Sequence, residues 1–112
     1  MGSPLNEPNE RDPAAVRARM VELSRKFIAR TVEDVAQMRE AFDKDGGLEL
    51  IRQLAHRACG TGGTLGLSAI SDAAGELERV VETFPDGAAP GAADRERITA
   101  GIDAIAAQLT SL

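Results

Sequence analysis

The only histidine and the only cysteine of this chain, His56 and Cys59, lie three residues apart in the stretch AHRACGTGGTLG, residues 55–66. Four of the eleven glycines also fall in this stretch. An imidazole can take part in nucleophilic, acid–base or metal chemistry near neutral pH. The residues around His56 decide which of these chemistries the sequence supports.

A cysteine beside a histidine suggests a nucleophile pair or a metal site, and the sequence supports neither. A catalytic dyad needs a third group and an oxyanion pocket, and a metal site needs further Cys or His ligands. We therefore interpret Cys59 as a small structural residue and expect no bound metal. The segment GTGGTLG lacks the Lys-Ser/Thr ending and the preceding strand of a phosphate-binding loop. We accordingly expect no ATP binding and no kinase activity of the chain's own.

Helical periodicity places His56 on the outside of its helix. The apolar residues of this helix centre on one direction: Leu48, Ile51, Leu54, Ala55 and Ala58. At about 100° per residue, His56 lies about 140° from that centre. A glycine within a helix costs about 0.5–1 kcal/mol relative to alanine, so Gly60, one turn later, needs a reason. Either Gly60 lets another macromolecule approach the ring, or it begins the fraying of a helix end beside an ordinary surface histidine.

Periodic apolar residues predict a long helical N-terminal region. Asp12 is expected to cap it, with Pro13 at the first helical position. Apolar residues then recur at spacings of three and four as far as Phe42. The segment Thr31–Asp34 resembles a capping box, which allows a break near Arg30. The pattern leaves open whether this region is one helix or two.

Three further helices are expected after a turn at 43–47, the last two separated by a loop at 85–91. In order they are residue 48 to a point within 60–66, residues 68–84 with Ser68 as N-cap, and residues 92–109. No strand pattern is present, so the predicted fold is all-α. It is an antiparallel up-and-down four-helix bundle with a disordered or short helical N-terminal extension. We expect residues 1–11 to form a flexible tail and residues 12–112 a single domain.

Composition supports one helical domain and narrows its partners. The 112 residues are 43% hydrophobic, with no Trp or Tyr and only three Phe, which is typical of an aliphatic helical core. A formal net charge of −5 without a basic stripe argues against nucleic-acid binding. A single cysteine cannot form an internal disulfide, which fits a reducing compartment. No charged-then-apolar pattern typical of a signal peptide is visible, and no apolar run approaches the length of about 18 residues that a membrane span needs. We therefore expect a cytoplasmic protein without a membrane association.

Residues 50–81, LIRQLAHRACGTGGTLGLSAISDAAGELERVV, resemble the histidine-containing phosphotransfer (HPt) domain family. The family's pattern is His, two residues, Lys, Gly, Ser or Thr, small residues, an apolar residue and Gly, followed by a helix that carries Leu-Glu. The matching positions here are His56, Gly60, Thr61, Leu65, Gly66 and Leu77-Glu78. The resemblance covers about a third of the chain. It implies a helical bundle in which the histidine carries a phosphoryl group.

The resemblance assigns a role to each matching residue. His56 would be phosphorylated, and Gly60 would let the partner's active site close over it. Glu78 would accept a hydrogen bond from the imidazole and leave Nε2 outward, unless it is simply a solvated helix residue. The chain would then be a stand-alone phosphoryl carrier in a multistep two-component phosphorelay.

The same resemblance implies the partners of the chain. They would be response-regulator receiver domains and a hybrid or ordinary histidine kinase. No cofactor would bind to this chain, and Mg²⁺ would be held by the partner receiver.

The sequence departs from the family's pattern at Cys59, where the family usually has lysine. A lysine would offset phosphoryl charge, which a cysteine cannot do. Around the helix, Arg52 lies about 40° from His56 and Arg57 about 100°, so Arg52 is the expected charge partner. We expect the partner-binding surface to consist of Arg52, Gln53, Arg57, Cys59, Gly60, Gly63 and Thr64.

Two other hypotheses stay open at this stage. Loss of the lysine favours a degenerate HPt-like adaptor that binds a receiver without phosphotransfer, whereas the retained His56 opposes it. A purely structural or dimerisation bundle would not depend on His56 at all. We expect a monomer, because the apolar helix faces are sufficient for a single core.

Overall fold

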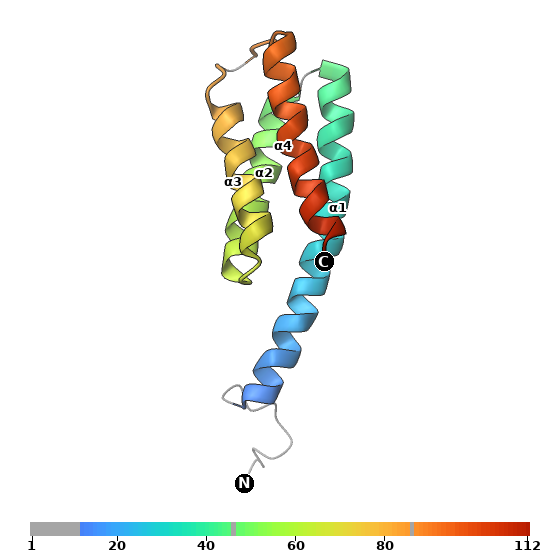
Figure 1. Ribbon diagram of the computed structural model, residues 1–112, viewed down its shortest axis with the longest axis vertical. Helices are drawn as coiled ribbons and strands as arrows, with labels where there is room; N and C mark the ends of the chain where they lie inside the picture. Colours follow the sequence, from blue (N-terminus) through green and yellow to red (C-terminus); the bar gives the residue numbers. More distant parts are fainter. Residues whose placement is uncertain (1–11, 46, 86) are drawn as a thin grey trace.

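The computed structural model describes residues 12–45, 47–85 and 87–112, so the predicted tail at residues 1–11 lies outside the described residues. Four helices account for most of the described chain: α1 (Pro13–Asp45), α2 (Leu48–Thr64), α3 (Ser68–Glu82) and α4 (Ala92–Thr110). Each helix packs against two neighbours, in the closed order α1, α2, α3, α4. Successive helices run in opposite directions (Figure 1). The predicted all-α four-helix bundle is confirmed.

The core of the bundle is almost entirely aliphatic. Each helix turns one stripe of apolar residues inward, as the spacings of three and four predict. The largest apolar side chains with no more than 1% exposure are Met38, Ile51, Ile70, Leu77, Ile98, Ile102 and Ile105. Close packing of the helices is helped by Gly101 of α4, where a Cβ atom would lie 2.8 Å from Leu77 Cδ1. The described helices include none long and apolar enough to cross a membrane.

Helix α1 is a single unbroken helix, so the structure has no break near Arg30. The hydroxyl of Thr31 donates a hydrogen bond to the backbone carbonyl of Phe27 at 2.8 Å and therefore caps no new helix. Asp34, the other end of the supposed capping box, is buried and accepts hydrogen bonds from Arg57 of α2. Neither side chain therefore begins a new helix, and α1 continues through both residues.

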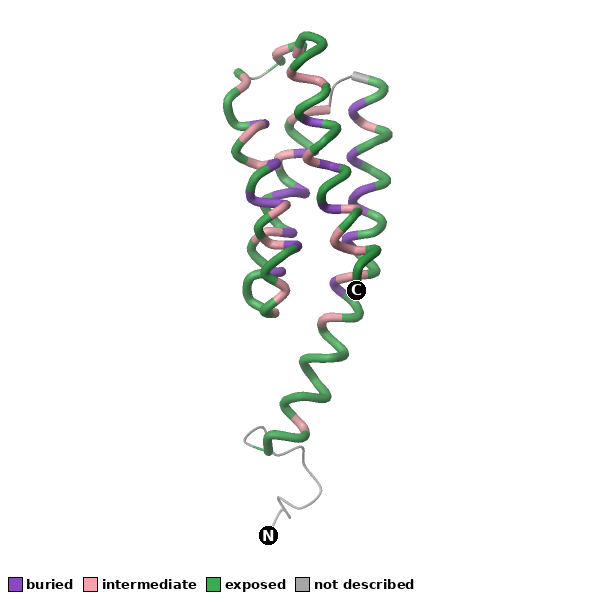
Figure 2. Tube along the Cα trace, in the orientation of Figure 1, coloured by how far each residue is buried: buried purple, intermediate pink, exposed green. Residues whose placement is uncertain are grey.

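The first part of α1, residues 13–26, extends past the ends of the other helices (Figures 1 and 2). We call these residues the extension. At 1.5 Å per residue it is about 21 Å long. The first buried residue of α1 is Phe27, and every residue of the extension is exposed or only partly buried. The helical extension allowed by the sequence is thus the beginning of α1 itself.

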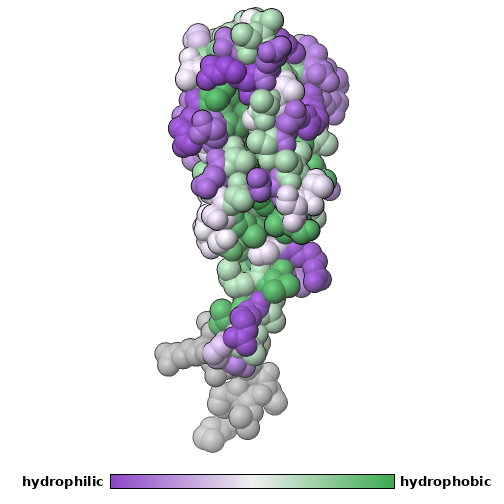
Figure 3. Space-filling view, in the orientation of Figure 1, coloured by the Kyte–Doolittle hydropathy of each residue, from purple (hydrophilic) through white to green (hydrophobic). Residues whose placement is uncertain are grey.

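The extension combines exposed apolar side chains with concentrated positive charge. Its apolar side chains, mixed with hydrophilic ones on the surface, include Val16, Met20 and Leu23 (Figure 3). The expectation of a monomer assumed that one core covers every apolar helix face. In the described residues, the core leaves the apolar face of the extension exposed. Four of its residues are basic, Arg17, Arg19, Arg25 and Lys26, against one acidic residue. The acidic net charge of the whole chain conceals this basic segment.

The helix ends agree with most, but not all, of the predictions. Asp12 caps α1, because its carboxylate accepts a hydrogen bond from the Ala14 N–H at 3.0 Å. Helix α2 continues through the glycine-rich segment to Thr64, within the predicted interval. The prediction of Ser68 as an N-cap is wrong: Ser68 is the first residue of α3, and Leu67 precedes it without a side-chain cap. Helix α3 ends at Glu82, two residues early, and α4 ends at Thr110, one residue late.

The tight connections before and after α2 both depend on glycine. Gly47 has φ +47°, and a Cβ atom there would lie 2.6 Å from Ala41 Cβ, so a larger residue would clash. Gly66 has φ +75°, and the flanking Leu67 N–H donates to the Gly62 carbonyl at 2.8 Å. This second turn reverses the chain within three residues, so that α3 returns directly along α2.

Candidate functional site

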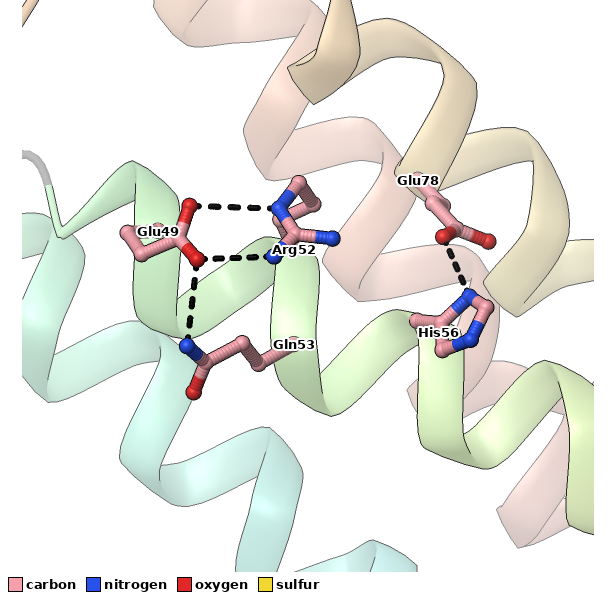
Figure 4. A network of polar contacts seen from close by, with 5 residues as sticks. All are labelled: Glu49, Arg52, Gln53, His56 and Glu78. Carbon is pink, nitrogen blue, oxygen red and sulfur yellow. Dashed lines mark hydrogen bonds and ion pairs between the residues drawn. The ribbon is translucent and has the colours of Figure 1, made fainter. Parts of the chain in front are cut away.

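His56 lies on the outer face of α2, as its angular position predicts. Its side chain is 72% exposed. The Nδ1 atom lies 2.6 Å from Oε2 of Glu78, which reaches across from α3 (Figure 4). The Glu78 side chain is only 15% exposed. A largely sheltered carboxylate therefore holds the inner edge of an otherwise free imidazole ring.

The contact with Glu78 defines which ring nitrogen can react. An ionised carboxylate can only accept hydrogen bonds, so the proton of a neutral imidazole belongs on Nδ1, which donates it to Glu78. The second nitrogen, Nε2, then carries the free lone pair. Because Nδ1 faces α3 and the ring is exposed, Nε2 is the nitrogen available to another molecule.

Helices α2 and α3 bring these residues together through a regular antiparallel alignment. His56 pairs with Glu78, and Cys59, one turn later, lies opposite Gly75, one turn earlier. At the next turn the hydroxyl of Ser71 donates to the backbone carbonyl of Cys59 at 2.8 Å. The short connection between the two helices sets this alignment, and the alignment in turn places Glu78 beside the ring.

Gly60 lies one turn beyond His56 on an open part of the surface. A Cβ atom at this position would meet nothing within 4 Å, so internal packing does not require glycine there. The helix continues for four residues past Gly60, so this glycine does not mark the helix end. The role of Gly60 in the approach of a partner stays a prediction.

Arg52, the expected charge partner, lies one turn before His56 on α2 and pairs with Glu49 (Figure 4). It donates to both carboxylate oxygens of Glu49, at 3.1 Å from Nε and 2.7 Å from Nη2 (Figure 4). These hydrogen bonds raise the pKa of Arg52 and lower the pKa of Glu49, which also accepts from Gln53. The structure shows no hydrogen bond between the described atoms of Arg52 and His56.

Arg57 turns toward α1 and away from the imidazole. Its Nη2 atom lies 3.0 and 3.1 Å from the two carboxylate oxygens of Asp34. The Asp34 side chain is 5% exposed, so this ion pair ties α2 to α1. The sequence signal for Asp34 was interpreted as a helix cap, and nothing local to it indicated a partner 23 residues later.

The model of the Hpt domain family matches residues 22–111, which is most of the chain. The chain belongs to the Hpt domain family. No curated protein and no solved structure matched it. Membership implies a phosphotransfer role in two-component signalling, in which Hpt domains interact with receiver domains and kinases.

Cys59 stands in this Hpt domain as part of the contact between α2 and α3. Its sulfur would lie 3.1 Å from a Cβ atom at Gly75 and lies 3.7 Å from the hydroxyl oxygen of Ser71. The residue is half-buried. Within residues 12–45, 47–85 and 87–112 there is no group of three or more His, Cys, Asp or Glu residues that could hold a metal ion. The geometry fits the interpretation of Cys59 as a small packing residue.

The remaining residues of the expected partner surface lie on α2 and are exposed: Gln53, Gly63 and Thr64. The hydroxyl of Thr64 donates to the carbonyl of Gly60 and so points back along the helix. An open groove between α1 and α2 adjoins this surface. Its walls include Gln53 and Arg57, the exposed apolar side chain of Leu50, and the basic residues Lys26 and Arg30.

Proposed function

We propose that this Hpt domain carries a phosphoryl group on Nε2 of His56 and passes it between receiver domains, or between a histidine kinase and a receiver. The observation that carries the proposal is the hydrogen bond between Nδ1 and Glu78, which leaves the opposite nitrogen exposed. The open space beside Gly60 supports it, because the partner's active site must close over the ring.

The chemical step needs little from the chain beyond the positioned nucleophile. The lone pair of Nε2 attacks the phosphorus of a receiver's aspartyl phosphate, so that an N–P bond forms and the P–O bond to the aspartate breaks. The aspartate leaves as a carboxylate, and no proton has to leave the attacking nitrogen. The ring gains positive charge, which the carboxylate of Glu78 offsets at 2.6 Å. The receiver's Mg²⁺ would supply charge stabilisation on the other side of the phosphoryl group.

The partner is expected to cover the outer face of α2 around His56. That face carries the exposed Gln53, Gly60, Gly63 and Thr64, and the groove between α1 and α2 extends it with apolar and basic side chains. The phosphoryl group must come from a partner, because the sequence has no nucleotide-binding motif. A cytoplasmic location, a stand-alone chain and a monomeric state stay predictions.

The test uses a panel of receiver domains from the same cell, phosphorylated with a small-molecule donor. Each is mixed with the wild-type chain and with the His56→Gln variant, and acid-labile, base-stable label is followed. We expect label on the wild-type chain alone, because glutamine keeps the approximate size but removes the nucleophile. Label on the variant at the wild-type level would mean that a residue other than His56 carries the phosphoryl group, and would contradict the proposal.

The same experiment distinguishes a phosphoryl carrier from a degenerate adaptor that binds a receiver without phosphotransfer. The cysteine at position 59 favours the adaptor. An adaptor would bind one receiver equally well with and without His56, and neither form would take label. A bundle with no signalling role would bind none of the receivers.

A further inference from the structure

The phosphoryl group proposed for His56 is a dianion, and the lysine that usually accompanies it in the family is replaced here by Cys59. The two arginines closest in sequence each donate two hydrogen bonds to one carboxylate. Arg52 holds Glu49 through two hydrogen bonds, and Arg57 holds the buried Asp34 of α1. A third arginine, Arg79 of the neighbouring helix α3, donates only one side-chain hydrogen bond in the described part of the chain.

Arg79 of α3 lies at the required level of the bundle. It follows Glu78, the residue hydrogen-bonded to His56, and its guanidinium turns toward Cys59. A Cβ atom at Gly75 would lie 3.1 Å from the Cys59 sulfur and 3.8 Å from Nη1 of Arg79. Both atoms thus lie within 4 Å of one point between the two helices. The absence of a side chain at Gly75 leaves the space through which the arginine reaches this position.

The direction of Arg79 follows from helix geometry. Side chains of a helix lean toward its N-terminus, so the arginine leans from the level of Glu78 toward Gly75. Because α3 runs antiparallel to α2, this is the direction from His56 toward Cys59. The guanidinium is consequently displaced from the level of His56 toward Cys59. A lysine side chain at position 59 would start from this same level of the bundle.

The bonding of Arg79 leaves it more available than the other two arginines. In the described part of the chain it donates one side-chain hydrogen bond, from Nη2 to Glu76 at 2.6 Å. Both members of this pair are more than two-thirds exposed, and ion pairs at such a surface are weak. A phosphoryl dianion is a better acceptor for the planar guanidinium than a solvated carboxylate. Nη1 faces the space beside Cys59.

We propose that Arg79 binds the phosphoryl group on His56 and supplies from α3 the cation that the family's lysine supplies from α2. This inference rests on the function proposed above for His56. Arg79 takes no proton and gives none. It pairs with the phosphoryl oxygens while the N–P bond forms and while it breaks, and so stabilises the phosphorylated form and the transition state of transfer.

The decisive experiment restores the lysine where the family has it. Four variants are compared with the wild-type chain: Arg79→Ala, Arg79→Lys, Arg79→Ala with Cys59→Lys, and Arg97→Ala. Arg97 is the matched control, since it also forms an exposed pair with an acidic residue three positions away, on α4, which does not pack against α2. The rate of label transfer from a saturating phosphorylated receiver and the half-life of the labelled histidine are measured for each.

We expect Arg79→Ala to slow transfer at saturating receiver about tenfold, which corresponds to the loss of one charge-assisted hydrogen bond. Arg79→Lys should recover part of the rate, and Cys59→Lys should return the Arg79→Ala chain to within about threefold of the wild type. Arg97→Ala should transfer at the wild-type rate. A merely structural role for Arg79 would not be rescued by a cation placed on the other helix.

Two results would overturn the inference while leaving the proposed function intact. One is a labelled wild-type chain whose Arg79→Ala variant transfers equally fast. The other is a slow Arg79→Ala variant that Cys59→Lys does not rescue, although its circular dichroism and thermal unfolding match the wild type. A wild-type chain that takes no label from any receiver would overturn the function of His56, and this inference with it.

Discussion

The two parts of helix α1 share one pattern of apolar residues but differ in what covers it. From Phe27 to Phe42 the stripe packs into the bundle, and Met38 is completely buried. In the extension the stripe continues through Val16, Met20 and Leu23 on the same side of the helix, yet these side chains stay 36–44% exposed. Periodicity therefore identifies a helix and its apolar face. It does not say whether another element lies against that face.

The strongest test of the difference between the two parts of α1 is the same substitution in the extension and in the part that packs into the bundle. Met38→Ala removes a completely buried side chain and should lower the free energy of unfolding by about 2–5 kcal/mol. Met20→Ala, on the same stripe in the extension, should change it by less than about 0.5 kcal/mol. Urea unfolding followed by circular dichroism measures both. Equal losses would mean that the extension's stripe is buried in solution.

An intermediate effect is expected for the acidic partners of the ion pairs. Asp34→Ala leaves Arg57 without its buried carboxylate and should cost about 2 kcal/mol of stability. Glu22→Ala breaks the exposed pair with Lys26 in the extension, and its effect should be within about 0.5 kcal/mol of zero. The same unfolding experiment applies, with Asp34→Asn as a control that keeps the shape. A stable Asp34→Ala chain would show that α2 does not depend on this tie to α1.

The smallest difference concerns helix propensity at exposed positions. Ala36→Gly lies on the exposed side of α1 within the bundle and should destabilise the protein by about 1 kcal/mol. Ala18→Gly is chemically the same change in the extension, where the helix can open without unfolding the bundle. We expect its midpoint of unfolding to be unchanged while its helical circular dichroism decreases. A matching loss of stability would couple the extension to the bundle.

Much of this architecture could be predicted because its signals are local. The apolar spacings identified the helices, and the angular position of His56 placed it outside the core. The contact of His56 with Glu78 was expected from the family resemblance, and the structure contains it. The continuity of α1 could not be predicted, because Thr31 and Asp34 have the types and spacing of a helix cap.

Two of the arrangements that sequence reasoning missed involve residues far apart in the chain. Asp34 meets Arg57 across α1 and α2, and Arg79 approaches Cys59 only because α2 and α3 align in one particular register. The angular positions of Arg52 and Arg57 relative to His56 describe one helix, α2. They contain no information about which residues of α3 lie beside it. A signal was nevertheless present: Gly75 lies within a helix, four residues before Arg79, and such a glycine often marks a close approach.

The connection at residues 65–67 has a consequence for how this protein can change over time. Its length helps to set how far α3 slides along α2, together with the hydrogen bond from Ser71 to the Cys59 carbonyl. An added residue that is taken up by α3 would shift the helix by about 1.5 Å and rotate it by about 100°, which would turn Glu78 away from the imidazole. Most surface positions around the site can be substituted without that penalty. Lineages of this protein should therefore vary in the composition of the site's surroundings far more freely than in the length of this turn.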